Sequence, residues 1–124
     1  MPNIENRFSW ASRFKSFVYA WNGILQFLKT EHNARIHLVL TIAVIILCLA
    51  LHVSAGEAAA LVIVIALVWI TELINTSLEK AMDFISTEKH PQIKWVKDLA
   101  AAAVLVAAIA AVIVGCIIFI PKFF

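Results

Sequence analysis

An unbroken apolar run at residues 99–120 places no charged side chain over 22 consecutive positions. At 1.5 Å per residue, a helix of that length spans about 33 Å, slightly more than the hydrocarbon core of a bilayer. The run therefore predicts a transmembrane helix. The whole chain is 63% hydrophobic with a mean hydropathy of +0.94, which excludes an ordinary soluble domain.

Two further segments are long and apolar enough to be spans. We predict an all-α integral membrane protein with three transmembrane helices, at about residues 34–53, 58–84 and 95–120. Between the first two spans, Ser54, Gly56 and Glu57 supply turn and helix-start chemistry. No repeat or low-complexity linker is visible, which indicates a single domain, residues 1–124.

The segment at about residues 12–30 has a different pattern, because apolar residues recur every three or four positions among basic and amide side chains. This pattern predicts an amphipathic helix in the plane of the membrane surface, although a helix packed on its own protein would have the same pattern. The first ten residues lack the features of a signal peptide, so we expect them to belong to the mature chain.

Basic residues predict the orientation of the spans. Nine of the ten Lys and Arg residues lie at one end of the predicted spans: five lie before the first span or at its start, and four lie from the end of the second span to the start of the third. They are Arg7, Arg13, Lys15, Lys29, Arg35, Lys80, Lys89, Lys94 and Lys97. By the positive-inside rule, we expect the N-terminus and these segments in the cytoplasm and residues 121–124 outside.

The second predicted span ends in a polar stripe, formed by Glu72, Asn75, Glu79 and Asp83. At 100° per residue, these side chains fall within about 80° of one another on a helix. A carboxylate near the bilayer centre costs about 2.5 to 3.5 kcal/mol on insertion scales, so such residues are kept mainly for function. Acceptor oxygens of this kind suit a divalent cation and a reacting hydroxyl. The stripe predicts chemistry at the membrane surface.

Helix crossing brings residues 29–35 and 94–98 to the same cytoplasmic interface. There, Glu31 and Glu79 are candidates to hold a magnesium ion that bridges nucleotide phosphates. Lys97 would offset phosphate charge. Glu72 lies deepest, where a lipid hydroxyl would sit, and is the candidate general base. The implied reaction is phosphoryl transfer to a lipid alcohol.

Most of these residues also have a structural interpretation. Lys97 could extend to the interface, and Asp98 could cap the third helix. Asn75 could join two helices. An ordinary interfacial position would also explain Glu79 and Lys80. His32 and His37 are candidates either for ligands or for interfacial residues, and the interfacial position is the more common one for histidine. Glu72 is the exception, because neither the second nor the third span offers it a cation at the same depth.

Neither the cysteines nor the glycines suggest a site of their own. Cys48 and Cys116 lie within apolar runs, where a thiol behaves as a small hydrophobe, so we expect neither a disulfide nor a metal pair. The three glycines form no GxxxxGK or GxGxxG spacing. A nucleotide would therefore be held without a glycine-rich phosphate loop.

The polar stripe and the segment that opens the third span carry a resemblance. ELINTSLEKAMD at 72–83 and KDLAAAA at 97–103 are similar to the motifs ELLNTAIExxxD and KDxAAAAV of the prokaryotic diacylglycerol kinase family. The similarity extends to FKSFVYAWNGI at 14–24, TEHNARIH at 30–37, EKHP at 88–91 and IIFIPK at 117–122. These added segments resemble the undecaprenol kinase branch of the family more than the diacylglycerol kinase branch.

The resemblance implies a homotrimer in the bacterial inner membrane, with composite active sites between subunits at the cytoplasmic interface. It implies ATP as co-substrate, Mg²⁺ as cofactor, Glu72 as catalytic base, and Glu31 and Glu79 as metal ligands. The positions that match residues around the nucleotide are Ser12, Arg13, Tyr19, Asn75, Asp83, Glu88, Lys89, His90, Lys97 and Asp98. Ser12 stands where the family has an arginine, and the neighbouring Arg13 lies about 100° away on a helix.

Together, these features predict a membrane kinase that transfers the γ-phosphoryl group of MgATP to a lipid hydroxyl. Undecaprenol is the preferred acceptor, and diacylglycerol is the alternative. A proton-coupled exporter would also need a carboxylate such as Glu72, but not the carboxylates gathered around it. A non-enzymatic assembly protein would need the helices but not the carboxylates. No nucleic-acid partner is expected.

Overall fold

The computed structural model describes residues 8–124, and this part of the chain contains four α-helices. They are α1 (Trp10–Thr30), α2 (His32–Ala50), α3 (Ala55–Ile85) and α4 (Pro91–Phe123). The chain divides into two compact units, of which the first ends at Arg35 and the second comprises Ile36–Phe124. Arg7, one of the basic residues used to predict orientation, lies outside the described residues.

In the first unit, α1 begins two residues earlier than predicted because Ser9 caps it. The Ser9 hydroxyl oxygen accepts a hydrogen bond of 3.5 Å from the backbone N–H of Ser12. The helix ends where the backbone N–H of Glu31 donates to the carbonyl of Phe27 at 2.9 Å. The predicted helix is therefore present, and its place at the membrane surface stays a prediction.

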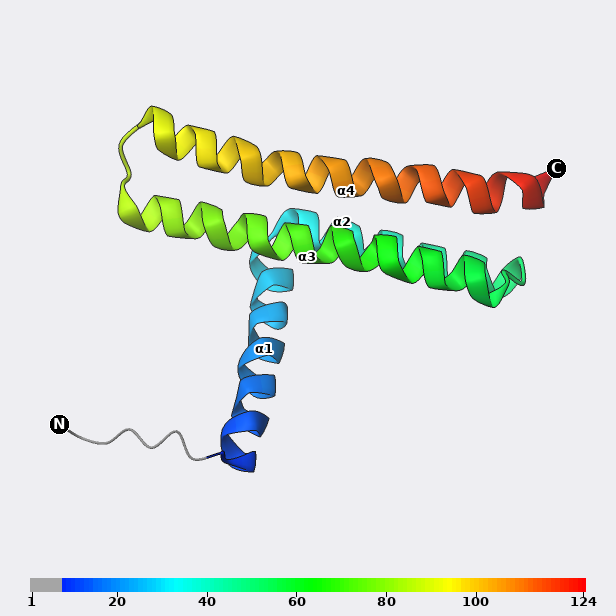
Figure 1. Cartoon of the computed structure of the whole chain (residues 1–124), viewed down its shortest axis with the longest axis horizontal. Helices are drawn as coiled ribbons and strands as arrows, with labels where there is room; N and C mark the ends of the chain where they lie inside the picture. The colour runs from blue at the N-terminus through cyan, green and yellow to red at the C-terminus, as the bar shows by residue number, and fades with distance from the viewer. Residues whose placement is uncertain (1–7) are drawn as a thin grey trace. The chain divides into compact units, whose positions relative to one another are not determined.

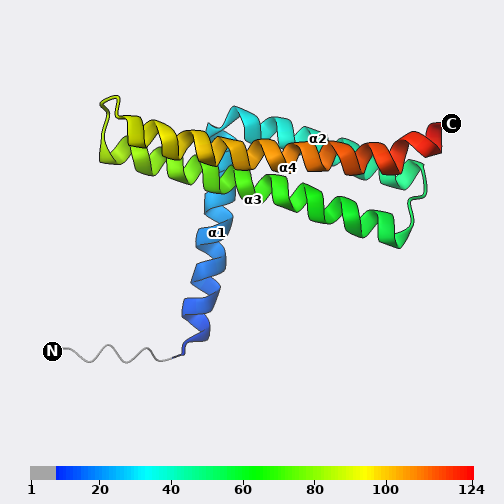
Figure 2. The ribbon, with the colours of Figure 1, turned by 45° about the horizontal axis from the view of Figure 1, so that its top comes forward.

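Three helices, α2, α3 and α4, are long and apolar enough to cross a membrane, judged by length and composition. The predicted number of spans is confirmed in that sense. Within the second unit, α3 and α4 run antiparallel and side by side, joined by the short segment 86–90 (Figures 1 and 2). Ala100 and Ala107 of α4 are buried. Their small side chains let a neighbouring helix approach closely.

The turn between α2 and α3 follows from its residues. His52 adopts a positive φ of 51°, a left-handed conformation that stops α2 at Ala50, three residues before the predicted end. Ser54 and Glu57 then form a capping box. The backbone N–H of Ser54 donates to Glu57 Oε2 at 2.7 Å, and that of Glu57 donates to Ser54 Oγ at 3.2 Å. The predicted helix-start chemistry is confirmed, and α3 begins at Ala55, three residues earlier than predicted, with Gly56 inside its first turn.

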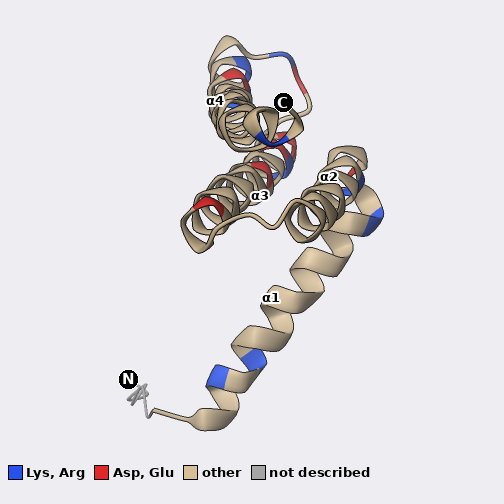
Figure 3. Ribbon diagram, turned by 90° about the vertical axis from the view of Figure 1, so that its right-hand side faces the viewer, with Lys and Arg blue, Asp and Glu red and all other residues tan. Residues whose placement is uncertain are grey.

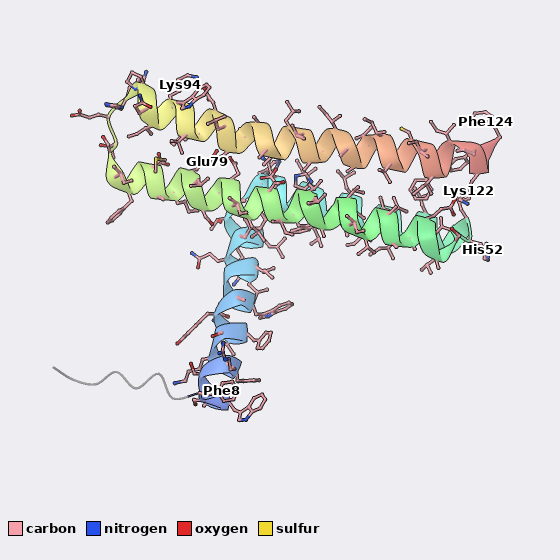
Figure 4. The ribbon with its side chains drawn as sticks, viewed as in Figure 1. Phe8, His52, Glu79, Lys94, Lys122 and Phe124 are labelled. Carbon is pink, nitrogen blue, oxygen red and sulfur yellow. The ribbon has the colours of Figure 1, made fainter. Side chains whose placement is uncertain are left out.

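Helix α4 begins four residues earlier and ends three residues later than predicted. Its N-cap is His90, whose Nδ1 accepts a hydrogen bond of 3.2 Å from the backbone N–H of Gln92, and Pro91 follows in the first turn. The interpretation of Asp98 as the cap of this helix is therefore wrong, because Asp98 lies two turns inside it. At the other end, Lys122 lies 3.0 Å from Glu57 and ties the end of α4 to the start of α3 (Figure 4).

Candidate active site

The polar stripe along α3 changes gradually from buried to exposed. Glu72 and Asn75 are buried, Glu79 is half-buried and Asp83 is exposed. Glu72 is the least accessible member of the stripe, and its predicted depth in the membrane stays a prediction. A charge at a buried position needs a partner, because burying an unpaired carboxylate is costly.

The partner of Glu72 comes from α2. His37 Nε2 lies 3.0 Å from Glu72 Oε1, and the two side chains are 19% and 5% exposed. The second and third spans were expected to offer Glu72 no cation, and its partner comes instead from the first, through His37, for which an interfacial position was expected. The TEHNARIH segment, which ends in His37, is the part of the sequence from which this partner of Glu72 could have been predicted.

A second contact joins the same two helices one turn away. The indole N–H of Trp69 on α3 donates to Thr41 Oγ1 on α2 at 3.0 Å. The Thr41 hydroxyl in turn donates to the backbone carbonyl of His37 at 2.7 Å. Thr41 follows His37 by four residues and Trp69 precedes Glu72 by three. The Thr41–Trp69 and His37–Glu72 contacts therefore lie next to each other along the interface between α2 and α3. Neither Thr41 nor Trp69 was predicted as a site residue.

Asn75 is only partly satisfied. Its Nδ2 donates to Glu79 Oε1 at 3.3 Å, while its buried Oδ1 has no hydrogen-bond partner among the residues that the structure describes. An unpaired buried acceptor costs about 1–3 kcal/mol, so such a group in a site suggests a missing ligand.

The oxygen atoms around Glu79 are of the type that magnesium prefers. Within residues 8–124, no three His, Cys, Asp or Glu side chains gather as a metal site. Magnesium commonly binds one or two carboxylates and takes substrate phosphates and water as its other ligands. The donor set of Glu79 and the Asn75 Oδ1 atom fits that kind of binding.

A polar cavity of about 660 Å³ lies where α3, the segment 86–90 and the first turns of α4 meet. Six of the predicted nucleotide residues line it: Asp83, Glu88, Lys89, His90, Lys97 and Asp98. Ser86, Thr87 and Lys94 also line it and were not in the predicted set. Figure 3 shows acidic and basic positions close together on this connection and the helix ends beside it. The structure thus brings these six residues together, and their role stays a prediction.

Four of the charged side chains that line the polar cavity form two ion pairs. Lys97 of α4 forms an ion pair with Asp83 of α3, and Lys94 forms one with Asp98 a turn further along α4. Ion pairs between exposed groups are worth only about 0–1 kcal/mol. A phosphate group can therefore compete for the two lysines at little cost.

A second, apolar cavity of about 440 Å³ lies among α2, α3 and α4. Valine, leucine, isoleucine and alanine form most of its wall, and polar atoms enter it chiefly from His37, Thr41 and Trp69. Its volume is within the range of about 300–1,000 Å³ of small-molecule sites. His37 thus lines the apolar cavity and contacts the buried carboxylate of Glu72. No feature of the sequence predicted this cavity.

Four predicted residues belong to the first unit. Ser12 and Tyr19 are exposed on α1, and the Arg13 guanidinium lies 5.5 Å from the centre of the Phe8 ring. Glu31 is the C-cap of α1, and its Oε1 accepts a hydrogen bond of 3.1 Å from the Thr30 hydroxyl. Their roles beside the residues of the second unit stay predictions.

Comparison with known proteins gives a consistent result. Residues 18–119 match the family described as prokaryotic diacylglycerol kinase. A diacylglycerol kinase of Synechocystis is 45% identical over 107 residues, which cover 86% of this chain and 61% of that protein. The undecaprenol kinase of Bacillus subtilis is 38% identical over 120 residues, or 97% of this chain and 94% of that protein. The diacylglycerol kinase of Escherichia coli K12 is 33% identical over 104 residues, with coverages of 84% and 85%.

The family match includes Glu31, the whole polar stripe and the polar cavity, whereas Ser12 and Arg13 lie before it. It confirms the resemblance found in the sequence. It also favours the kinase interpretation over an exporter or an assembly protein. Because the match covers most of the chain, and the Bacillus subtilis relative aligns over nearly its full length, the chain belongs to the prokaryotic diacylglycerol kinase family of lipid kinases.

Proposed function

We propose that this chain transfers the γ-phosphoryl group of ATP to the hydroxyl of a membrane lipid, with undecaprenol as the acceptor. The observation that carries the proposal is the position of Glu72. This buried carboxylate is joined through His37 to the apolar cavity, and its helix continues to the polar cavity and its lysines. A lipid tail and a nucleotide need these two different environments near one base.

In the proposed reaction, Glu72 accepts the proton of the lipid hydroxyl while the hydroxyl oxygen bonds to the γ-phosphorus. The bond from the γ-phosphorus to the bridging oxygen breaks, and ADP leaves with the electron pair. The products are a lipid phosphate, ADP and a proton that Glu72 returns to water. Most of the catalysis is positioning and electrostatics, as in other phosphoryl transfers.

The phosphate chain would lie in the polar cavity, where Lys97 and Lys94 exchange their carboxylate partners for phosphate oxygens. Asn75 Oδ1, which lacks a protein partner among the described residues, would accept a hydrogen bond or coordinate a cation. Magnesium, when bound through Glu31 and Glu79, supplies positive charge beside the phosphates.

The proposed assembly is a homotrimer whose active sites lie at the cytoplasmic side of the bacterial inner membrane. Support for the membrane setting comes from the many large apolar side chains that α2, α3 and α4 expose, among them Val39, Ile63 and Ile113. Support for the orientation comes from the basic residues counted in the sequence.

Two acceptors remain as proposals. Undecaprenol is preferred because the undecaprenol kinase of Bacillus subtilis aligns with 97% of this chain, including the segments at both ends. Diacylglycerol is the second candidate, because the Synechocystis diacylglycerol kinase is 45% identical over the region that it shares.

The test supplies the purified protein in mixed micelles with MgATP and either undecaprenol or diacylglycerol. We expect phosphorylated lipid with both and a higher kcat/KM with undecaprenol. A higher value with diacylglycerol would reverse the order of acceptors. No phosphorylated lipid from either acceptor would overturn the kinase proposal for this chain.

A further inference from the structure

We propose that His37 is a positioning residue for Glu72, which holds one carboxylate oxygen of the base and leaves the other for the lipid hydroxyl. This inference rests on the proposed function, because it takes Glu72 as the group that accepts the hydroxyl proton. It concerns the partner of the base, to which neither the sequence motifs nor the nucleotide residues assign a role.

The first argument is geometric. His37 Nε2 lies 3.0 Å from Glu72 Oε1, within hydrogen-bond range, and the contact joins α2 to α3. An ionised carboxylate has no hydrogen to donate, so the imidazole Nε2–H is the donor whenever Glu72 is ready to act as a base. A charge-assisted bond of this kind is about twice as strong as one between neutral groups.

The second argument comes from burial. The Glu72 side chain is only 5% exposed, so little water reaches it to replace a lost donor. With Oε1 bound by His37, Oε2 remains as the acceptor for the substrate proton. The hydrogen bond from His37 therefore leaves Oε2 as the oxygen that accepts the proton, and it fixes the orientation of the carboxylate.

The third argument is the support behind His37. Thr41 donates to the backbone carbonyl of His37 and accepts from the Trp69 indole, so the turn of α2 that carries His37 is fastened to α3 one turn from Glu72. Such backing holds a functional side chain in a narrow range of orientations. The three residues also line the apolar cavity, so a lipid seated there would lie against His37, whose imidazole contacts Glu72.

The test compares two amides of different reach. His37→Gln places a side-chain N–H about as far from the backbone as the imidazole Nε2, whereas the shorter His37→Asn cannot reach Glu72 Oε1. His37→Leu removes the donor altogether. His52→Asn is the matched control, because His52 lies in the turn between α2 and α3 and asparagine tolerates its positive φ. For each variant, kcat and KM are measured in mixed micelles and expressed per folded protein.

We expect His37→Asn and His37→Leu to lower kcat by about 10- to 100-fold, the loss expected for one hydrogen bond to a charged group. The KM for ATP should stay within about twofold, because the nucleotide cavity is unchanged. His37→Gln should recover most of kcat, and His52→Asn should equal the wild type.

Equal kcat values for His37→Gln and His37→Asn would overturn the inference, whatever their size, since both amides keep a polar group at this position. A wild-type kcat in folded His37→Leu would overturn it as well. These outcomes differ from failure of the proposed function, in which the wild-type protein itself would phosphorylate no lipid.

Discussion

Lys97 near the start of α4 forms an ion pair with Asp83 near the end of α3, and both side chains line the polar cavity. A comparable pair, Lys122 with Glu57, joins the other ends of the same two helices. The two pairs brace one helix hairpin at opposite ends. Because only the first pair borders the polar cavity, they offer a matched comparison of function with stability.

Lys97→Met should raise the KM for ATP by about tenfold, since one charge-assisted contact to phosphate is worth about 1.5–3 kcal/mol. Lys122→Met removes the other pair and should leave the KM for ATP unchanged. Initial rates over a range of ATP concentrations measure both. Equal increases in the two variants would show that the effect comes from loosening of the hairpin.

Glu72→Gln should lower kcat by at least about 100-fold. General bases raise reaction rates by about 10²- to 10⁴-fold, and the amide of glutamine cannot accept a proton at neutral pH. The glutamine keeps an oxygen that can accept from His37, so folding and ATP binding should be retained. Glu57→Gln is the control on the same helix, because glutamine also completes a capping box. Near-normal turnover in Glu72→Gln would remove Glu72 from its role as base.

Asn75→Leu should separate stability from function. The substitution removes a buried oxygen that has no partner among the described residues, so we expect thermal stability without nucleotide to be unchanged or raised by up to about 1–2 kcal/mol. The KM for ATP should rise, because the amide is lost as a ligand. Thermal unfolding with and without MgATP checks both effects. Stabilisation by MgATP equal to that of the wild type would argue against a nucleotide contact at Asn75.

His90 has a structural role and a predicted nucleotide role, and two substitutions distinguish them. His90→Asn keeps an N-cap for α4, whereas His90→Leu removes it and should cost about 0.5–2 kcal/mol of stability. If His90 contacts the nucleotide, both variants should weaken ATP binding to a similar degree. Loss of ATP binding in His90→Leu alone would mean that the cap is its whole contribution.

Several elements of this protein follow from local patterns. The apolar run at 99–120 has the length that a bilayer requires, and the stripe from Glu72 to Asp83 follows from helical periodicity. Helix ends were predicted less well. The start of α4 was misplaced because His90 is an uncommon cap, and the end of α2 was misplaced because a histidine adopts a left-handed conformation.

Some functional residues were likewise predictable from the sequence, and others were not. The sequence by itself determined the three helices long enough to cross a membrane, the polar stripe and the family, because each depends on residues close together along the chain. Only the tertiary structure decided that His37 is the partner of Glu72 and that Thr41 and Trp69 support it. The physical reason is that α2 is apolar around nearly its whole circumference, so its pattern does not specify which face turns toward α3. That rotation depends on packing between helices.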